Sequence, residues 1–296
     1  MIEDLKGLGV AMVTPFDENR KIDFKSLERL TRFLVESHVD YLVVNGTTGE
    51  SVTLSNEEVY EVLASVLEYA ENKPVWIGCG GNDTLKIAKK MEKFEKDFPI
   101  KGFLSVSPYY NKPTQKGIKA HYEYLAKSTS KPIILYNIPG RTASEISIET
   151  ILQLSETQNI VGIKDAVNDV NKSMLLASKV PSHFALLAGD DSMALPLFAC
   201  GYHGVISVVG NILPKEFKKM IDFALMQDFE NARKLHYKLL PLMIALFKEG
   251  NPTGVKACLE ILGICERYVR LPLVEVSHEL YQEFQKMLKV NELASN

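Results

Sequence analysis

The chain has 296 residues, of which 46% are hydrophobic and 24% are charged, and its formal net charge is −3. This composition supports a full hydrophobic core, and without a basic stripe carrying interleaved aromatic residues it argues against a nucleic-acid partner. The first ten residues do not follow a signal-peptide pattern and no uncharged apolar run reaches the length of a bilayer, so we expect a cytoplasmic protein that makes no membrane contact.

Short apolar runs rich in β-branched residues alternate with helical patterns as far as about residue 226. The expected strands cover residues 8–13, 40–45, 74–79, 102–106, 132–137, 159–164, 184–188 and 204–209. Apolar residues at helical spacing occupy residues 27–34, 59–67, 84–97, 114–128, 147–154, 170–179, 192–200 and 214–226. Ser55 and Glu58 form a capping-box pattern before the second of these helices.

Eight successive strand–helix units predict parallel strands, because each helical crossover returns the chain to the same edge of the sheet. Their number and total length match an α/β fold of the (β/α)8 TIM-barrel type. The remaining sequence is helical, at about 228–248, 253–263 and 275–290. We therefore expect a catalytic barrel over residues 1–226 and a C-terminal helical extension over residues 227–296 that packs on it.

The carboxyl ends of the barrel strands are where such a fold places its active site. Polar side chains follow several of these strands: Thr47, Thr48, Tyr109, Tyr110, Tyr136, Arg141 and Lys164. Lys164 is the most informative, because it ends an otherwise apolar strand and lysine is rarely buried unless it is paired or used. The pattern predicts that these side chains converge on one mouth of the barrel.

This set of side chains suits imine chemistry. An apolar interior disfavours the ammonium form of a lysine, and a neutral amine attacks a ketone to form an imine. Tyrosine and threonine hydroxyls both donate and accept protons, so they can move the protons that imine formation requires. An arginine just beyond the strand, such as Arg141, suits a bidentate grip on a carboxylate.

Each of these residues also has an ordinary structural explanation. Lys164 could extend its head into water at the strand end, Tyr136 could be a core tyrosine, and Arg141 could form a surface ion pair. Thr47 and Thr48 could simply complete a turn between Gly46 and Gly49.

Other polar patterns favour structure over chemistry. Asp190 and Asp191 could bind a metal, but capping of the helix that follows them is the preferred interpretation. The segment GCGGND at residues 78–83 lacks the spacing of a phosphate loop and is interpreted as a turn. Six scattered histidines predict no metal site, and four cysteines without C-x-x-C spacing are typical of free thiols in a reducing compartment.

Several motifs in the same order resemble the superfamily of pyruvate-dependent class I aldolases that contains the dihydrodipicolinate synthases and the N-acetylneuraminate lyases. They are GVAMVTPF, NGTTGES, PYYNKPTQ, YNIPGRT, GIKDA, GDD, GVISV, NPTGVK and VRLPLV, and they cover nearly the whole chain. Within the superfamily the chain is most similar to the dihydrodipicolinate synthase family.

That resemblance implies a set of roles. Lys164 would carry pyruvate as a Schiff base, Tyr136 would exchange protons beside it, and Thr47 would link Tyr136 to Tyr110 of a neighbouring subunit. Thr48 would hold the pyruvate carboxylate, Arg141 would bind the carboxylate of L-aspartate-4-semialdehyde, and Gly189 and Ile206 would line the pyruvate pocket. The resemblance further implies a homotetramer built as a dimer of dimers, with no cofactor beyond the covalent imine.

Two other functions compete with this one. A sister aldolase that splits N-acetylneuraminate or a 2-keto-3-deoxy sugar acid would share the lysine and the tyrosine, but such lyases generally lack an arginine at the place of Arg141. A non-catalytic barrel would keep the fold and not the whole polar set.

The resemblance also bears on regulation. Lysine-inhibited relatives have histidines on the helix after GTTGES and a glutamate after the third strand, where this chain has Asn56, Val59 and Lys86. Ser51, Asn82 and Tyr109 are retained. We therefore expect that free L-lysine does not inhibit this protein.

Overall fold

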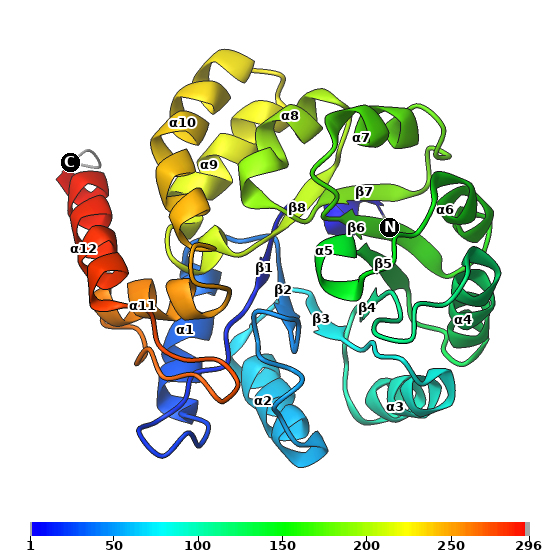
Figure 1. Ribbon diagram of the computed structural model, residues 1–296, viewed down its shortest axis with the longest axis horizontal. Helices are drawn as coiled ribbons and strands as arrows, with labels where there is room; N and C mark the ends of the chain where they lie inside the picture. The colour runs from blue at the N-terminus through cyan, green and yellow to red at the C-terminus, as the bar shows by residue number, and fades with distance from the viewer. Residues whose placement is uncertain (1, 294–296) are drawn as a thin grey trace.

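Eight parallel strands close into a barrel in chain order in the computed structural model, which describes residues 2–293 (Figure 1). The strands are β1 Gly7–Ala11, β2 Tyr41–Val44, β3 Val75–Gly78, β4 Gly102–Val106, β5 Ile133–Asn137, β6 Ile160–Asp165, β7 Ala185–Ala188 and β8 Gly204–Ser207. The expected strands are all confirmed, with ends that differ by one or two residues at most.

Helices follow the strands and surround the barrel. They are α1 Phe24–Glu36, α2 Asn56–Tyr69, α3 Thr84–Asp97, α4 Gln115–Lys127, α5 Pro139–Thr142, α6 Ile148–Ser155, α7 Val170–Ala177, α8 Ala194–Ala199 and α9 Pro214–Leu225, with 3-10 turns η1 Ile2–Leu5, η2 Asp191–Met193 and η3 Val209–Asn211. The capping box of Ser55 and Glu58 is present at α2. The single turn α5 was not expected, because four residues are too few to show a helical period.

The strands separate two apolar layers, as expected for a barrel whose interior is filled by side chains. One cluster fills the inside, with Tyr41, Trp76 and Ile206 among its members. The larger cluster lies between the strands and the surrounding helices, where Leu8, Phe103 and Phe217 are buried. Both faces of every strand are therefore covered, which explains why the strand sequences are almost continuously apolar.

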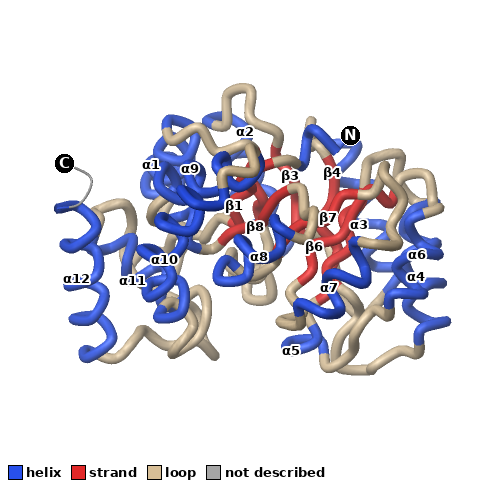
Figure 2. Tube along the Cα trace, turned by 90° about the horizontal axis from the view of Figure 1, so that it is seen from above, coloured by secondary structure: helices blue, strands red, loops and turns tan. Residues whose placement is uncertain are grey.

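Three further helices lie to one side of the barrel: α10 Phe229–Ala245, α11 Thr253–Ile261 and α12 His278–Leu293. Figure 2 shows α12 as the outermost of them, with α10 and α11 between it and the barrel. We propose the division into a barrel at 1–226 and an extension at 227–296, since α9 ends at Leu225 and α10 starts at Phe229. Residue 1 and residues 294–296 of those ranges lie outside the described part.

The two aspartates after β7 differ in what they do. Asp190 accepts hydrogen bonds from the backbone nitrogen and the hydroxyl of Ser192, so its predicted capping role is confirmed. For Asp191 the same prediction is wrong, because its buried carboxylate accepts from the nitrogens of Val208 and Val209 instead. It therefore ties the end of β8 to the loop that follows β7.

No helix between residues 2 and 293 combines the length and the apolar character that crossing a membrane needs. Within the same part of the chain, no three His, Cys, Asp or Glu side chains are grouped so that they could hold a metal ion.

Candidate active site

Lys164 points into the barrel because β6 contains an irregularity. Ile133 pairs with Ile160, but the next residue of β5, Ile134, pairs with Gly162, so β6 has one extra residue at this point. Ile160 packs outward, and strict alternation from it would turn residue 164 outward as well. The extra residue reverses the alternation, as a β-bulge does, so that Lys164 becomes the register partner of the inward-facing Tyr136.

The Lys164 side chain is almost fully enclosed, with 5% of the residue exposed. Its nitrogen lies 4.4 Å from the centre of the Tyr136 ring. No described carboxylate lies within ion-pair distance of it, so no ion pair has to break before the amine attacks a carbonyl carbon. The alternative in which Lys164 extends its head into water does not fit this burial.

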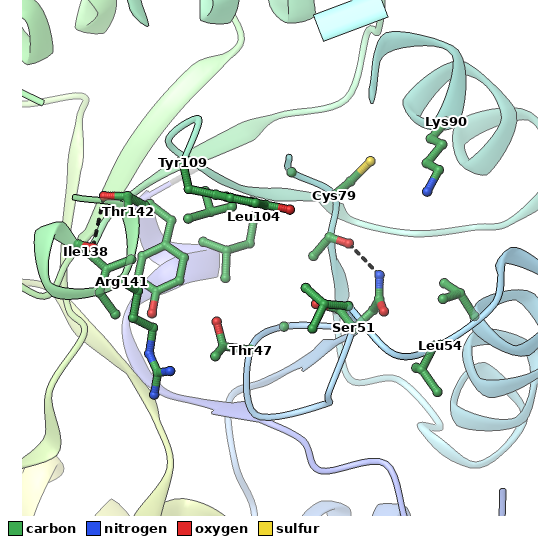
Figure 3. Close-up of a pocket in the computed structure, with 18 of the residues that line it drawn as sticks. Thr47, Ser51, Leu54, Cys79, Lys90, Leu104, Tyr109, Ile138, Arg141 and Thr142 are labelled. Carbon is green, nitrogen blue, oxygen red and sulfur yellow. Dashed lines mark hydrogen bonds between the residues drawn. The ribbon is translucent and has the colours of Figure 1, made fainter. Parts of the chain in front are cut away.

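A cavity of about 540 Å³ opens beside this pair at the carboxyl ends of β2 to β5. Thr47, Tyr109, Tyr136 and Arg141 line it, so four of the predicted polar side chains do converge. In Figure 3 the Thr47 hydroxyl and the Arg141 guanidinium both extend into the open space. Lys164 is not itself among the lining residues, but its nitrogen lies against the ring of Tyr136, which is one of them.

The charged residues among the described lining of the cavity are both cations, Arg141 and Lys90. They lie on opposite sides of the cavity in Figure 3. The Arg141 side chain is exposed and forms no ion pair with the described residues, which argues against a purely structural surface role. A cleft with two cations and no lining carboxylate favours anionic ligands such as carboxylates.

The Thr47–Thr48 turn serves both structure and site. The carbonyl of Gly46 accepts from the Gly49 nitrogen at 3.1 Å and that of Thr47 accepts from the Glu50 nitrogen at 3.1 Å, which fixes the turn. Thr47 lines the cavity, whereas Thr48 is buried. The Thr48 hydroxyl oxygen accepts a hydrogen bond of 3.0 Å from the side-chain amide of Asn251, far along the chain.

The remaining predicted residues lie in three different settings. Tyr110 is 88% exposed, with a backbone φ of 70°, and does not line the cavity. Ile206 is buried in the interior cluster. Gly189 follows β7, and a Cβ there would lie 2.8 Å from the Cβ of Ala166, so only glycine fits.

A thiol also borders the cavity, that of Cys79. Burial raises the pKa of this thiol to about 12, so it stays protonated at neutral pH and does not compete with an amine for a carbonyl.

Two contacts of the site were not predicted. Asn251 begins the motif NPTGVK, between the helical patterns at 228–248 and 253–263, but nothing in the sequence indicates that Thr48 is its partner. On α3 the lysine that lines the cavity is Lys90, whereas Lys86 is directed to solvent and pairs with Asp83 at 3.3 Å.

The comparisons with known proteins agree with this geometry. The model of the dihydrodipicolinate synthetase family matches residues 4–291. A curated 4-hydroxy-tetrahydrodipicolinate synthase of Flavobacterium psychrophilum is 43% identical over 277 residues, which cover 93% of this chain and 94% of that protein.

Solved structures give the same result. Dihydrodipicolinate synthase from Aquifex aeolicus superimposes with a TM-score of 0.94 at 41% identity, covering 97% of this chain and 98% of that one. The chloride-inhibited dihydrodipicolinate synthase from Acinetobacter baumannii, solved with pyruvate, has a TM-score of 0.94 at 38% identity and covers 96% and 98%.

Proposed function

Because the chain belongs to the dihydrodipicolinate synthetase family, we propose that its barrel condenses pyruvate with L-aspartate-4-semialdehyde. The activity is that of its curated relatives, 4-hydroxy-tetrahydrodipicolinate synthase, a lyase reaction of lysine and diaminopimelate biosynthesis. The observation that carries the site assignment is the enclosed amine of Lys164 against Tyr136, beside a cavity whose charged lining is cationic. The covalent carrier is Lys164 itself, so the proposal includes no separate cofactor.

The reaction begins on Lys164. Its nitrogen attacks the ketone carbon of pyruvate and water leaves, which forms the imine. Loss of a proton from C3 converts the imine into an enamine, whose C3 then attacks the aldehyde carbon of the semialdehyde. The amine of the bound semialdehyde finally attacks the imine carbon, displaces Lys164 and closes the ring.

The other residues bind substrate or move protons. Tyr136 gives and takes the protons that these steps exchange, since its hydroxyl can act as donor and acceptor. Thr48 holds the pyruvate carboxylate, and Arg141 holds the carboxylate of the semialdehyde.

Two further groups of residues complete the proposed site. Thr47 links Tyr136 to Tyr110 of the partner subunit, and Gly189 and Ile206 line the pyruvate pocket. These roles are supported by the cavity lining at Thr47 and by the close backbone approach at Gly189.

A homotetramer, built as a dimer of dimers, is part of the proposal. Large apolar side chains stand exposed on the surface, among them Val52 on the cavity wall, Tyr110 and Leu271. Beside Val52, the Thr53 carbonyl accepts a hydrogen bond of 2.9 Å from the Arg270 guanidinium, which joins this surface to the segment that precedes Leu271. We propose the cytoplasm as the location, which the four free cysteines support.

A coupled assay tests the reaction. Purified protein with pyruvate and L-aspartate-4-semialdehyde should release a product that an added dihydrodipicolinate reductase reduces. The accompanying oxidation of the reduced nicotinamide cofactor is the signal that is measured. N-acetylneuraminate and 2-keto-3-deoxy sugar acids serve as the rival substrates in parallel. Turnover of a sugar acid in place of the semialdehyde would overturn the assignment in favour of the sister aldolases.

A further inference from the structure

Asn251, outside the barrel, forms a hydrogen bond with a residue of the proposed pyruvate site. It lies in the loop between α10 and α11, and its side-chain nitrogen donates to the Thr48 hydroxyl oxygen at 3.0 Å. Both residues are buried. A polar contact that joins two buried side chains 203 positions apart needs both partners in place, since either one alone would be left unsatisfied.

The direction of this hydrogen bond matters for the chemistry of Thr48. A hydroxyl group has one hydrogen to donate and two lone pairs to accept with. Since the amide of Asn251 occupies an acceptor position, the hydrogen of Thr48 remains free to point at a ligand. A carboxylate accepts hydrogen bonds and donates none, so the arrangement prepares Thr48 to bind one.

A second contact holds the same turn from the same side. Lys256 on α11 is fully buried, and its nitrogen lies 2.6 Å from Glu50 Oε1 and 2.7 Å from the Tyr268 carbonyl oxygen. The other carboxylate oxygen of Glu50 accepts from the Arg270 backbone nitrogen at 3.0 Å. The turn that begins at Thr47 is thus held at two points, at Thr48 by Asn251 and at Glu50 by Lys256.

We propose that Asn251 is a positioning residue for pyruvate that acts through the Thr48 hydroxyl, and that the Lys256–Glu50 pair keeps the turn in register with it. The C-terminal extension is then part of the substrate site, although none of its described residues lines the cavity. This inference rests on the pyruvate-carboxylate role proposed above for Thr48.

The test measures the pyruvate dependence of the full-length enzyme with Asn251→Ala and Asn251→Asp. Loss of the amide should raise the KM for pyruvate about tenfold, the equivalent of one hydrogen bond, and leave the KM for the semialdehyde unchanged. Asn251→Asp is nearly isosteric but can only accept, so it should draw the Thr48 hydrogen away from pyruvate and raise that KM further.

A double-mutant cycle separates this role from general support of the loop. If Asn251 acts through Thr48, then Thr48→Val combined with Asn251→Ala should have no higher pyruvate KM than Thr48→Val alone. Thr253→Val is the matched control, because Thr253 donates only within its own turn, to the carbonyls of Glu249 and Gly250. It should lower the melting temperature and leave the pyruvate KM unchanged.

Three results would overturn the inference. The first is a pyruvate KM in the double variant that rises by the product of the two single-variant fold-changes. The others are an unchanged pyruvate KM in Asn251→Ala and the same rise of that KM in Thr253→Val. Should Asn251→Ala fail to fold, the near-isosteric Asn251→Asp and calorimetric titration with pyruvate decide the question alone. Trapping of the unmodified enzyme with pyruvate and borohydride is run beside them. A lack of imine there would refute the proposed function, whereas an imine with unaffected Asn251 variants would refute only this inference.

Discussion

Lys164 on β6 and Tyr136 on β5 are register partners, and 4.4 Å separate the Lys164 nitrogen from the centre of the Tyr136 ring. Neighbouring parallel strands hold both groups on rigid backbone, so their separation does not depend on a loop. Proton transfer between a hydroxyl and a nearby reacting centre requires this kind of fixed geometry. The strand pair therefore supplies both the nucleophile and the acid–base group of the proposed reaction.

The first prediction concerns the imine. Pyruvate with borohydride should add one reduced adduct per chain, on Lys164, as peptide mass spectrometry would show. Lys164→Ala should abolish the adduct, and Lys164→Arg should not restore it, because a guanidinium stays protonated. Lys256 is an internal control: it is also buried, but its amine is held by Glu50 and should remain unlabelled. Labelling of any other lysine in place of Lys164 would refute the prediction.

Arg141 should select the second substrate. Arg141→Ala should lower kcat/KM for the semialdehyde by about 1.5–3 kcal/mol, the range for a hydrogen bond to a charged group, or roughly 10- to 150-fold. Imine formation with pyruvate should survive. Lys86→Ala, which removes an exposed cation of α3 outside the cavity lining, is the control and should leave the semialdehyde kinetics unchanged. Loss of imine formation in Arg141→Ala would contradict the assignment.

Tyr110 should act in the site of a neighbouring subunit. Its side chain is exposed and lies off the cavity of its own chain. Mixing unfolded Tyr110→Phe and Lys164→Ala chains and refolding them together should restore part of the activity, because some mixed sites contain both native residues. If the mixture stays as inactive as its parents, Tyr110 serves its own chain.

Free L-lysine should not inhibit the enzyme. The replacement of a glutamate by Lys86 suggested this, but Lys86 is 82% exposed and paired with Asp83, so the relevant cation is Lys90 on the cavity wall. An ammonium group of a ligand would be repelled there. The measurement is the initial rate with lysine titrated into the low millimolar range. Saturable inhibition that disappears when Tyr109 is changed would show that the prediction is wrong.

Asp191 should make stability depend on pH. Burial raises the pKa of its carboxyl to about 6, and one of its oxygens has no partner among the described residues. The unfolded value is about 3.9, so the native state binds the proton more tightly and loses stability as pH rises from about 4 to about 6. Asp191→Asn cannot ionise.

Urea unfolding at pH 4 and pH 7 checks this. Between pH 4 and pH 7, the free energy of unfolding of Asp191→Asn should rise by about 2 kcal/mol relative to that of the unmodified protein. A constant difference between the two proteins at both pH values would contradict the prediction.

The order of strands and helices could be predicted because it depends on local patterns. The candidate site followed from it, since a barrel places all its strand ends at one mouth. The inward direction of the Lys164 side chain depends on a feature that the sequence pattern does not show. The extra residue of β6 beside Gly162 lies in a run that is apolar throughout, so it does not alter the apolar pattern. Periodicity cannot reveal an irregularity between two residues that are both expected to be buried.

The contact between Asn251 and Thr48 was out of reach for a related reason. Nothing local distinguishes a loop asparagine that caps its own turn from one that bonds a distant hydroxyl. Lys86 and Lys90 show the same limit, since both stand on one helix and only the packed fold decides which of them borders the cavity.

The buried pair of Lys256 and Glu50 has a consequence for how this enzyme can change over generations. Removing one partner of an enclosed ion pair costs about 3–5 kcal/mol, a large share of the stability of a typical domain. A recombination event that replaced the helices after α9 with those of a relative lacking the lysine would leave a stranded carboxylate beside the substrate turn. Such an exchange should therefore destabilise the protein, and substitutions at positions 50 and 256 should occur as a pair.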